Sequence, residues 1–235
     1  VDHYEQALVL APGDADSYSN LGNALAALDR TDDAVRNLRR ALDIDPSSAE
    51  AHGALGLALQ SQGRIDEAIV HLRQAVDLGP APADLHNNLG VALASQNRLD
   101  EAGTQFGRAL DLDPDFLNAH ANLATVAQLQ GSPDQAIHHY REMLRIRPNS
   151  SDTHNDLGLT LAARGELPLA VEHFRQAIAL DPSFAQAHAN LGTALQLQGA
   201  LEDAIQHYRE AVRIAPDTTE FQSRLNAALA ALTTR

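Results

Sequence analysis

Cysteine and lysine are both absent from this chain of 235 residues. Without cysteine, the protein has no disulfide, no thiolate nucleophile and no cysteine-bound zinc. Without lysine, it has neither a lysine Schiff base nor a P-loop lysine for nucleotide phosphates. These two absences remove several classes of enzyme before any motif is considered.

Positive charge is also scarce, since all 17 basic residues are arginines and the formal net charge is −14. A surface this acidic repels phosphate groups, and we therefore expect neither nucleic acid nor an anionic membrane as a partner. A neutral or basic protein surface fits better. Apolar runs fall short of the roughly 20 residues that cross a bilayer, so no membrane insertion is predicted. No signal peptide is visible after Val1, which predicts a cytoplasmic protein, either processed or cut from a longer chain.

A leucine recurs every 34 residues along the whole chain. Its positions are Leu21, Leu55, Leu89, Leu123, Leu157, Leu191 and Leu225. Glycine follows five of them, at Gly22, Gly56, Gly90, Gly158 and Gly192, and Ala124 follows Leu123. A fixed period of this length indicates stacked copies of one supersecondary unit, which present long surfaces and not a deep catalytic cleft.

Each copy has the pattern of two helices. In the first, Tyr18, Leu21 and Leu25 recur on one helical face; a second amphipathic helix follows from about Asp32 and ends before Pro46. The predicted units are residues 15–48, 49–82, 83–116, 117–150, 151–184 and 185–218, with a half repeat at 1–14 and a capping or half-repeat helix at 219–235.

Small residues mark two further places in the repeat. Glycine or asparagine occupies the turn between the helices, where left-handed backbone is expected. An invariant alanine (Ala34, Ala68, Ala102, Ala136, Ala170 and Ala204) lies on the second helix. Together with the glycine after the leucine, this alanine predicts a closely packed helical hairpin, because a mid-helix glycine costs about 1 kcal/mol in helix propensity.

The Leu-Gly pair, the second-helix alanine, an aromatic four residues later and the closing proline resemble the tetratricopeptide repeat (TPR) over the whole chain. The resemblance implies an all-α, right-handed superhelical solenoid of antiparallel helix pairs whose first helices line a concave groove. Runs such as Ala187-His188-Ala189-Asn190-Leu191-Gly192 resemble the repeats of O-GlcNAc transferase and its bacterial relatives, although no glycosyltransferase segment is present.

The resemblance places the residue before each leucine in the groove, where asparagines form a ladder that binds peptide backbone. This row contains Asn20, Asn88, Asn122 and Asn190, interrupted by Ala54 and Asp156. A carboxamide has one acceptor and two donors for a peptide group, whatever the peptide side chains. The alternative is that these asparagines are solvated or bond neighbouring helices.

A second row, four residues earlier, is mostly acidic and includes Asp16, Glu50, Asp84 and Asp152. If it lines the same groove, the groove favours ligands with arginine or lysine. The alternative is that these acids complement the positive end of the helix macrodipole, which predicts the same residue types.

Ten of the eleven histidines fall into two rows, one on each helix of the repeat. The rows are His52, His86, His120, His154 and His188, and His3, His71, His139, His173 and His207. Members of a row lie one repeat apart, whereas a metal needs ligands that converge on one point. We therefore assign these histidines to packing and predict no metal site.

We predict a scaffold that binds an extended peptide segment in its groove, with no enzymatic activity and no cofactor, because no set of catalytic residues stands out from the repeat pattern. Two alternatives stay open. One is a self-assembling solenoid, in which the last helix of one copy docks head-to-tail on the first half-repeat of the next. The other is the substrate-recruiting arm of a larger enzyme such as a glycosyltransferase.

Overall fold

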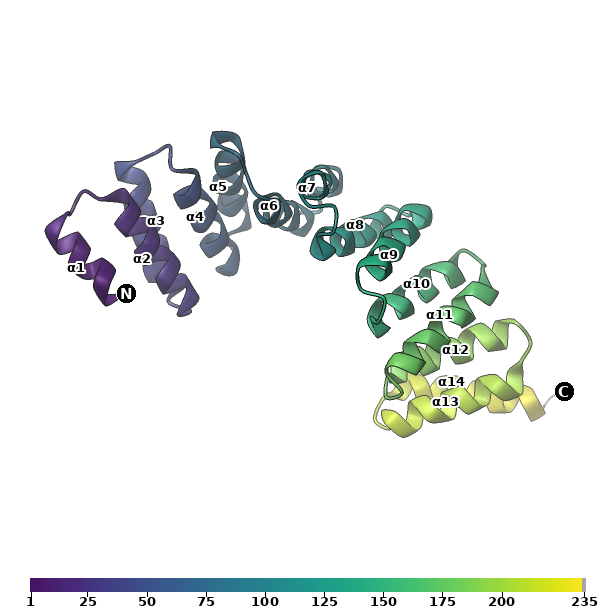
Figure 1. Cartoon of the computed structure of the whole chain (residues 1–235). Helices are drawn as coiled ribbons and strands as arrows, with labels where there is room; N and C mark the ends of the chain where they lie inside the picture. The colour runs from purple at the N-terminus through teal and green to yellow at the C-terminus, as the bar shows by residue number, and fades with distance from the viewer. Residues whose placement is uncertain (234–235) are drawn as a thin grey trace. The chain divides into compact units, whose positions relative to one another are not determined.

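The computed structural model describes residues 1–233, which form fourteen α-helices and no strand (Figure 1). Helices α1 to α7 are Asp2–Leu10, Ala15–Ala27, Thr31–Ile44, Ala49–Ser61, Ile65–Leu78, Ala83–Ser95 and Leu99–Leu112. Helices α8 to α14 are Leu117–Leu129, Pro133–Ile146, Ser151–Ala163, Leu167–Leu180, Ala185–Leu197, Leu201–Ile214 and Thr219–Thr233. The last two residues of the predicted 219–235 helix lie outside the described part of the chain.

The helices alternate between two types. The first helices of the repeats are α2, α4, α6, α8, α10, α12 and α14, and the second helices are α1, α3, α5, α7, α9, α11 and α13. Within a repeat the two helices pack against each other along their length, as α4 does with α5. The expected all-α solenoid of antiparallel helix pairs is therefore confirmed.

The turns between the paired helices have left-handed backbone at one position, as predicted. Gly63, Gly131, Gly165 and Gly199 have φ between 68° and 87°. Asp29 and Asn97 occupy the same place with φ of 59° and 58°. Glycine suits this conformation because it has no Cβ to clash, and Asp and Asn tolerate it better than most residues.

The glycine after each leucine allows the two helices to approach closely. A Cβ on Gly90 would lie 2.5 Å from Cε1 of Phe106, and a Cβ on Gly56 would lie 2.6 Å from Cγ of Leu72. The invariant alanine of the second helix is fully buried in every repeat. The predicted close-packed hairpin is therefore confirmed, and its core consists of these contacts repeated along the chain.

The chain divides into two compact units, of which the first is Val1–Asn122 and the second begins at Leu123. In the first unit, neighbouring first helices (α2 with α4, α4 with α6) contact one another, whereas α3, α5 and α7 make no such contact among themselves. In the second unit, the first helices α10 and α12 contact each other, whereas the second helices α11 and α13 do not. Each unit thus has an inner face made by its first helices.

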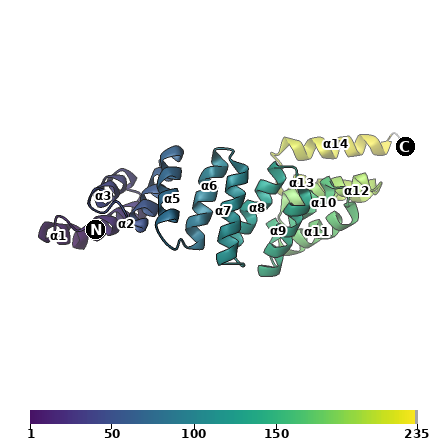
Figure 2. The same ribbon diagram turned by 90° about the horizontal axis from the view of Figure 1, so that it is seen from above.

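Helix α14 closes the described chain by packing on α12 and α13, along one edge of the second unit (Figure 2). Its Phe221 and Ala228 are buried, whereas Leu232 is partly exposed. Within residues 1–233 no helix is long and apolar enough to cross a membrane.

Candidate functional site

The four asparagines of the predicted ladder lie on first helices but differ in exposure. Asn20 on α2 is exposed, Asn88 on α6 and Asn122 on α8 are half-buried, and Asn190 on α12 is only 5% exposed. Equivalent places in the repeat thus have different surroundings.

The asparagines also differ in the residue 35 positions earlier, on the preceding first helix. Nδ2 of Asn122 donates a 2.9 Å hydrogen bond to Oδ1 of Asn87. Nδ2 of Asn190 donates a 2.9 Å bond to Oδ1 of Asn155, and Oδ1 of Asn190 accepts one from Gln186. Two of the four ladder amides therefore bond a neighbouring helix, which was the alternative considered for them.

Asn88 has no such partner because the residue 35 positions earlier is Gly53. No hydrogen bond holds the Asn88 side chain among the described residues, and Asn88 lines a cavity. The exposed side chain of Asn20 likewise has no hydrogen-bond partner among residues 1–233. The amides of Asn20 and Asn88 are consequently available to a ligand.

Asp156, which interrupts the ladder on α10, is half-buried. Burial raises the pKa of its carboxyl, and the nearby carboxylate of Asp152 raises it further. A 3.3 Å hydrogen bond from Asn155 opposes this rise. The site thus carries a carboxylate that the protein destabilises, where a neutral amide would fit.

The acidic row lies exposed on the first helices, and all but one of its carboxylates, Glu220 on α14, lack internal partners among the described residues. Among the described residues, Asp16, Glu50, Asp84 and Asp152 form neither an ion pair nor a hydrogen bond. Only Glu220 on α14 is paired, with Arg224 at 2.5 Å.

Apart from Arg224 on α14, the helical arginines lie on the second helices of the repeats. Helices α2, α4, α6, α8, α10 and α12 contain no arginine. The arginines of the second helices pair with acids there, as Arg39 does with Glu67 at 3.2 Å and Arg73 with Glu101 at 2.5 Å. The inner faces therefore carry uncompensated negative charge.

The inner face of the first unit contains a cavity of about 450 Å³ between α4 and α6. Gly53, Ala54, Leu57 and Leu85 give it an apolar lining, with Ala75 of α5 and the segment 79–82 beneath. Polar groups at its rim come from Asn23, Glu50, Asp84 and Asn88. Glu50, Asp84 and Asn88 belong to the rows predicted from the sequence, whereas the cavity itself, lined by the small residues Gly53 and Ala54, was not predicted.

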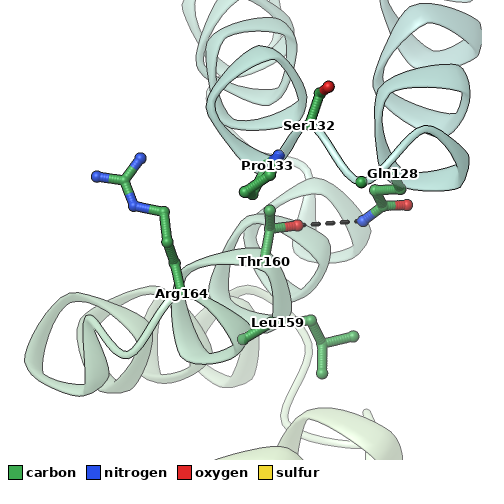
Figure 3. Close-up of a pocket in the computed structure, with 8 residues that line it drawn as sticks. Gln128, Ser132, Pro133, Leu159, Thr160 and Arg164 are labelled. Atoms are coloured by element: carbon green, nitrogen blue, oxygen red, sulfur yellow. Dashed lines mark hydrogen bonds between the residues drawn. The ribbon is translucent and has the colours of Figure 1, made fainter.

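The second unit has a cavity of about 500 Å³ between the α8–α9 turn and α10 (Figure 3). Nε2 of Gln128 donates a 3.1 Å hydrogen bond to the Thr160 hydroxyl at its edge. Leu159 and Pro133 provide apolar surface. Arg164, also on the rim, is paired with Asp134 and Glu166, so its charge is already balanced.

The two histidine rows meet in pairs, which sequence analysis did not predict. The Nδ1 atoms of His52 and His71 are 2.9 Å apart, those of His154 and His173 3.0 Å, and those of His188 and His207 3.2 Å. In the third repeat, Oε1 of Gln105 replaces the second histidine at 2.9 Å from His86. The signal in the sequence was the constant spacing of 19 residues between the rows.

The geometry of these pairs is that of an N–H···N hydrogen bond. Nε2 of His52 donates to the carbonyl of Pro46 at 3.1 Å, so its Nδ1 carries the lone pair that accepts from His71. The ring centroids of His52 and His71 are 5.2 Å apart, whereas their Nδ1 atoms are 2.9 Å apart. The difference is about one imidazole diameter, that is, one ring radius on each side. The two rings therefore meet edge to edge, and their lone-pair directions do not converge on a third point. No group of three metal-ligating side chains is found in residues 1–233.

Helix pairs repeated every 34 residues, with first helices forming the inner face of each unit, define a helical-repeat solenoid. The chain belongs to the tetratricopeptide repeat family: a tetratricopeptide repeat model matches residues 54–115 and 155–218. Further models of this family match residues 3–36, 22–63 and 115–183, and none of the matched models describes a catalytic domain. No curated protein sequence matches the chain.

Several solved structures share the fold. YrrB, a TPR protein described as having an unusual peptide-binding site, is 23% identical and superposes with a TM-score of 0.71 over 78% of this chain and 95% of YrrB. MamA is 25% identical, with a TM-score of 0.66 over 70% of this chain and 96% of its own. PilF of Pseudomonas aeruginosa is 26% identical, with a TM-score of 0.69 over 89% and 95%.

Proposed function

We propose that the protein is a non-enzymatic scaffold that binds an extended, neutral or basic peptide segment on its inner faces. The observation that carries this proposal is the separation of charge: the first helices have exposed carboxylates without partners, whereas every second-helix arginine lies on the other side. A basic ligand would gain electrostatic attraction there without displacing any internal ion pair.

In this proposal, the row of Asn20, Asn88, Asn122 and Asn190 binds the peptide backbone. Asn20 and Asn88 offer free amides, whereas Asn122 and Asn190 each donate one N–H to Asn87 or Asn155, and Asn190 is buried besides. We infer that Asn20 and Asn88 contribute most to affinity. The fold shared with YrrB, which has a peptide-binding site, supports the same class of ligand.

The test is a selection of peptides from a random octapeptide library on the immobilised protein, followed by fluorescence anisotropy with the enriched peptides. The variant Asn20→Ala/Asn88→Ala is expected to lose at least tenfold in affinity at an unchanged far-UV CD spectrum. Affinity should also fall with added salt, because the attraction comes from exposed charges. If no peptide is enriched, or if the double variant binds as tightly as the parent, the proposal is wrong.

A second candidate function is head-to-tail self-association, favoured by the apolar surface of α1. This helix has no buried residue, and Val9 and Leu10 are 79% and 87% exposed. Light scattering over a concentration series tests it: the mass should rise with concentration, and Val9→Asp/Leu10→Asp should prevent the rise. A constant monomer mass at the highest concentration would exclude it.

The finer likeness to the repeats of O-GlcNAc transferase remains a proposal, as does the associated role of a substrate-recruiting arm. It is supported by the Asn-Leu-Gly runs of the ladder. A glycosyltransferase segment in the full-length gene would strengthen it, and a gene without one would rule it out.

A further inference from the structure

The cavity between α4 and α6 lies where two features of the groove are interrupted at once. Ala54 breaks the asparagine ladder, and Gly53 removes the partner that would hold Asn88. The result is an apolar hollow with a free carboxamide at its edge. Elsewhere, as at Asn87 and Asn122, the corresponding amides are bonded to each other.

The size and lining of the hollow suit a side chain of a ligand. Its volume of about 450 Å³ falls within the range of roughly 300–1,000 Å³ typical of ligand pockets. Leu57 projects into the inner face with 42% of its surface exposed, although it is a large apolar residue. Covering Leu57 and Leu85 with an apolar group would remove this surface from water.

The rim determines what must lie on either side of that group. Glu50 of α4 and Asp84 of α6 flank the hollow, and neither carboxylate has a partner among the described residues. No arginine lies on α2, α4 or α6 to balance them. A ligand that placed a carboxylate here would be repelled, whereas one with guanidinium or ammonium groups would complete two ion pairs.

We propose that this cavity is the anchor site for one bulky apolar side chain of a peptide that carries arginine or lysine next to that residue. The side chain enters the hollow over Gly53 and Ala54. The Asn88 carboxamide bonds the peptide backbone, and Glu50 and Asp84 bind the adjacent basic residues. This inference rests on the proposed function and specifies the ligand of the same groove.

Another repeat of the chain provides the model for a variant that blocks the cavity. Gly53→Asn would recreate at Asn88 the arrangement of Asn87 with Asn122, and the side chain would occupy the hollow. A Cβ on Gly53 meets only Cδ1 of Leu85 at 3.5 Å and the Cβ of Ala75 at 3.8 Å, which are ordinary contacts, so the backbone here accepts a side chain at its first carbon. Ala54→Leu fills the same space from the next position. The control is Gly107→Asn on the second helix α7, where nothing lies within 4 Å of an added Cβ.

The experiment uses the peptides enriched from the octapeptide library and measures their anisotropy with each variant. We expect the peptides to share a Leu, Ile, Phe or Met flanked by Arg or Lys. Gly53→Asn and Ala54→Leu should each weaken binding about ten- to hundredfold, which corresponds to losing the burial of one apolar side chain. Gly107→Asn should stay within about twofold.

The outcomes separate the two proposals. Peptides that depend on Asn20 and Asn88 but lack the apolar anchor, or that bind both blocking variants as tightly as the parent, would overturn the anchor site and leave the groove intact. Acidic residues beside the anchor in the enriched peptides would also overturn it. A library that yields no binder would overturn the groove itself, and the anchor site with it.

Discussion

The amide nitrogen of Asn190 lies 2.9 Å from the amide oxygen of Asn155, so that two first helices of neighbouring repeats are joined through buried side chains. Each of the two residues, Asn155 and Asn190, has only 5% of its surface exposed to solvent. A buried polar group is costly unless it is hydrogen-bonded, so this pair makes one residue of the proposed binding row important for stability.

Asn190→Ala should therefore destabilise the protein by about 1–3 kcal/mol, because it leaves the Asn155 oxygen buried without its donor. Asn20→Ala, at the equivalent but exposed place, should change stability by no more than about 0.5 kcal/mol. Urea unfolding followed by far-UV CD compares the two. A double-mutant cycle with Asn155→Ala should show coupling, and additive effects would contradict the linkage.

The histidine pairs should make the protein sensitive to mild acid. Burial lowers the pKa of His71, His173 and His207, and the partner histidine lowers it further. The unfolded chain then binds more protons than the folded chain below pH 6.5, so stability is full above that pH and falls as the pH drops through the lowered folded-state pKa. Thermal unfolding between pH 7.5 and 5 should show Tm falling on the acid side.

The third repeat supplies the matched control for this prediction. His86 pairs with Gln105, whose oxygen accepts from a histidine in either charge state, whereas a doubly protonated histidine pair cannot keep its bond. The triple variant His71→Gln/His173→Gln/His207→Gln should keep its stability at pH 7.5 within about 1–2 kcal/mol and lose most of its acid sensitivity. An unchanged pH profile would show that other groups cause it.

Two helical glycines should respond to alanine in opposite directions. Gly107→Ala on α7 should stabilise the protein by up to about 1 kcal/mol, because an added Cβ meets nothing and alanine favours the helix. Gly90→Ala should destabilise it by about 1–3 kcal/mol, because the new methyl would lie 2.5 Å from the Phe106 ring. Denaturation midpoints measured side by side would reveal the sign of each change.

Asp156→Asn should stabilise the protein at neutral pH. Because the folded-state pKa of Asp156 lies above its usual value, its contribution is full below about pH 3.8 and is lost as the pH rises through the folded-state pKa. The amide avoids that loss, and we expect a rise in Tm on the order of 1 °C at pH 7 with none near pH 3. The same variant also places a carboxamide in the row of Asn190 within the second unit, so in the proposed binding mode it should tighten peptide binding. Weaker binding would indicate that the carboxylate itself contacts the ligand.

The 34-residue period was enough to predict the helix pairs, the left-handed turns and the close approach at residues such as Gly56, because each depends on contacts inside one repeat. The asparagines were harder to assign. Asn20 and Asn190 hold the same place in the repeat, yet one is exposed and the other is buried. The Asn190 amide is bonded to a side chain 35 residues earlier, and each histidine pair joins residues 19 positions apart. Comparing residues within one row of the repeat reveals neither the 35-residue nor the 19-residue spacing. Both spacings can be found in the sequence once the partner helix is known.

The bond between an asparagine and its neighbour 35 residues earlier has a consequence for how such arrays diversify. In the proposed binding mode, the chemistry of a repeat depends on the repeat before it, because Asn155 bonds the amide of Asn190 whereas Gly53 leaves the amide of Asn88 without a partner. Duplicating, deleting or shuffling whole repeats would therefore create new binding surfaces at the junctions without a single point mutation.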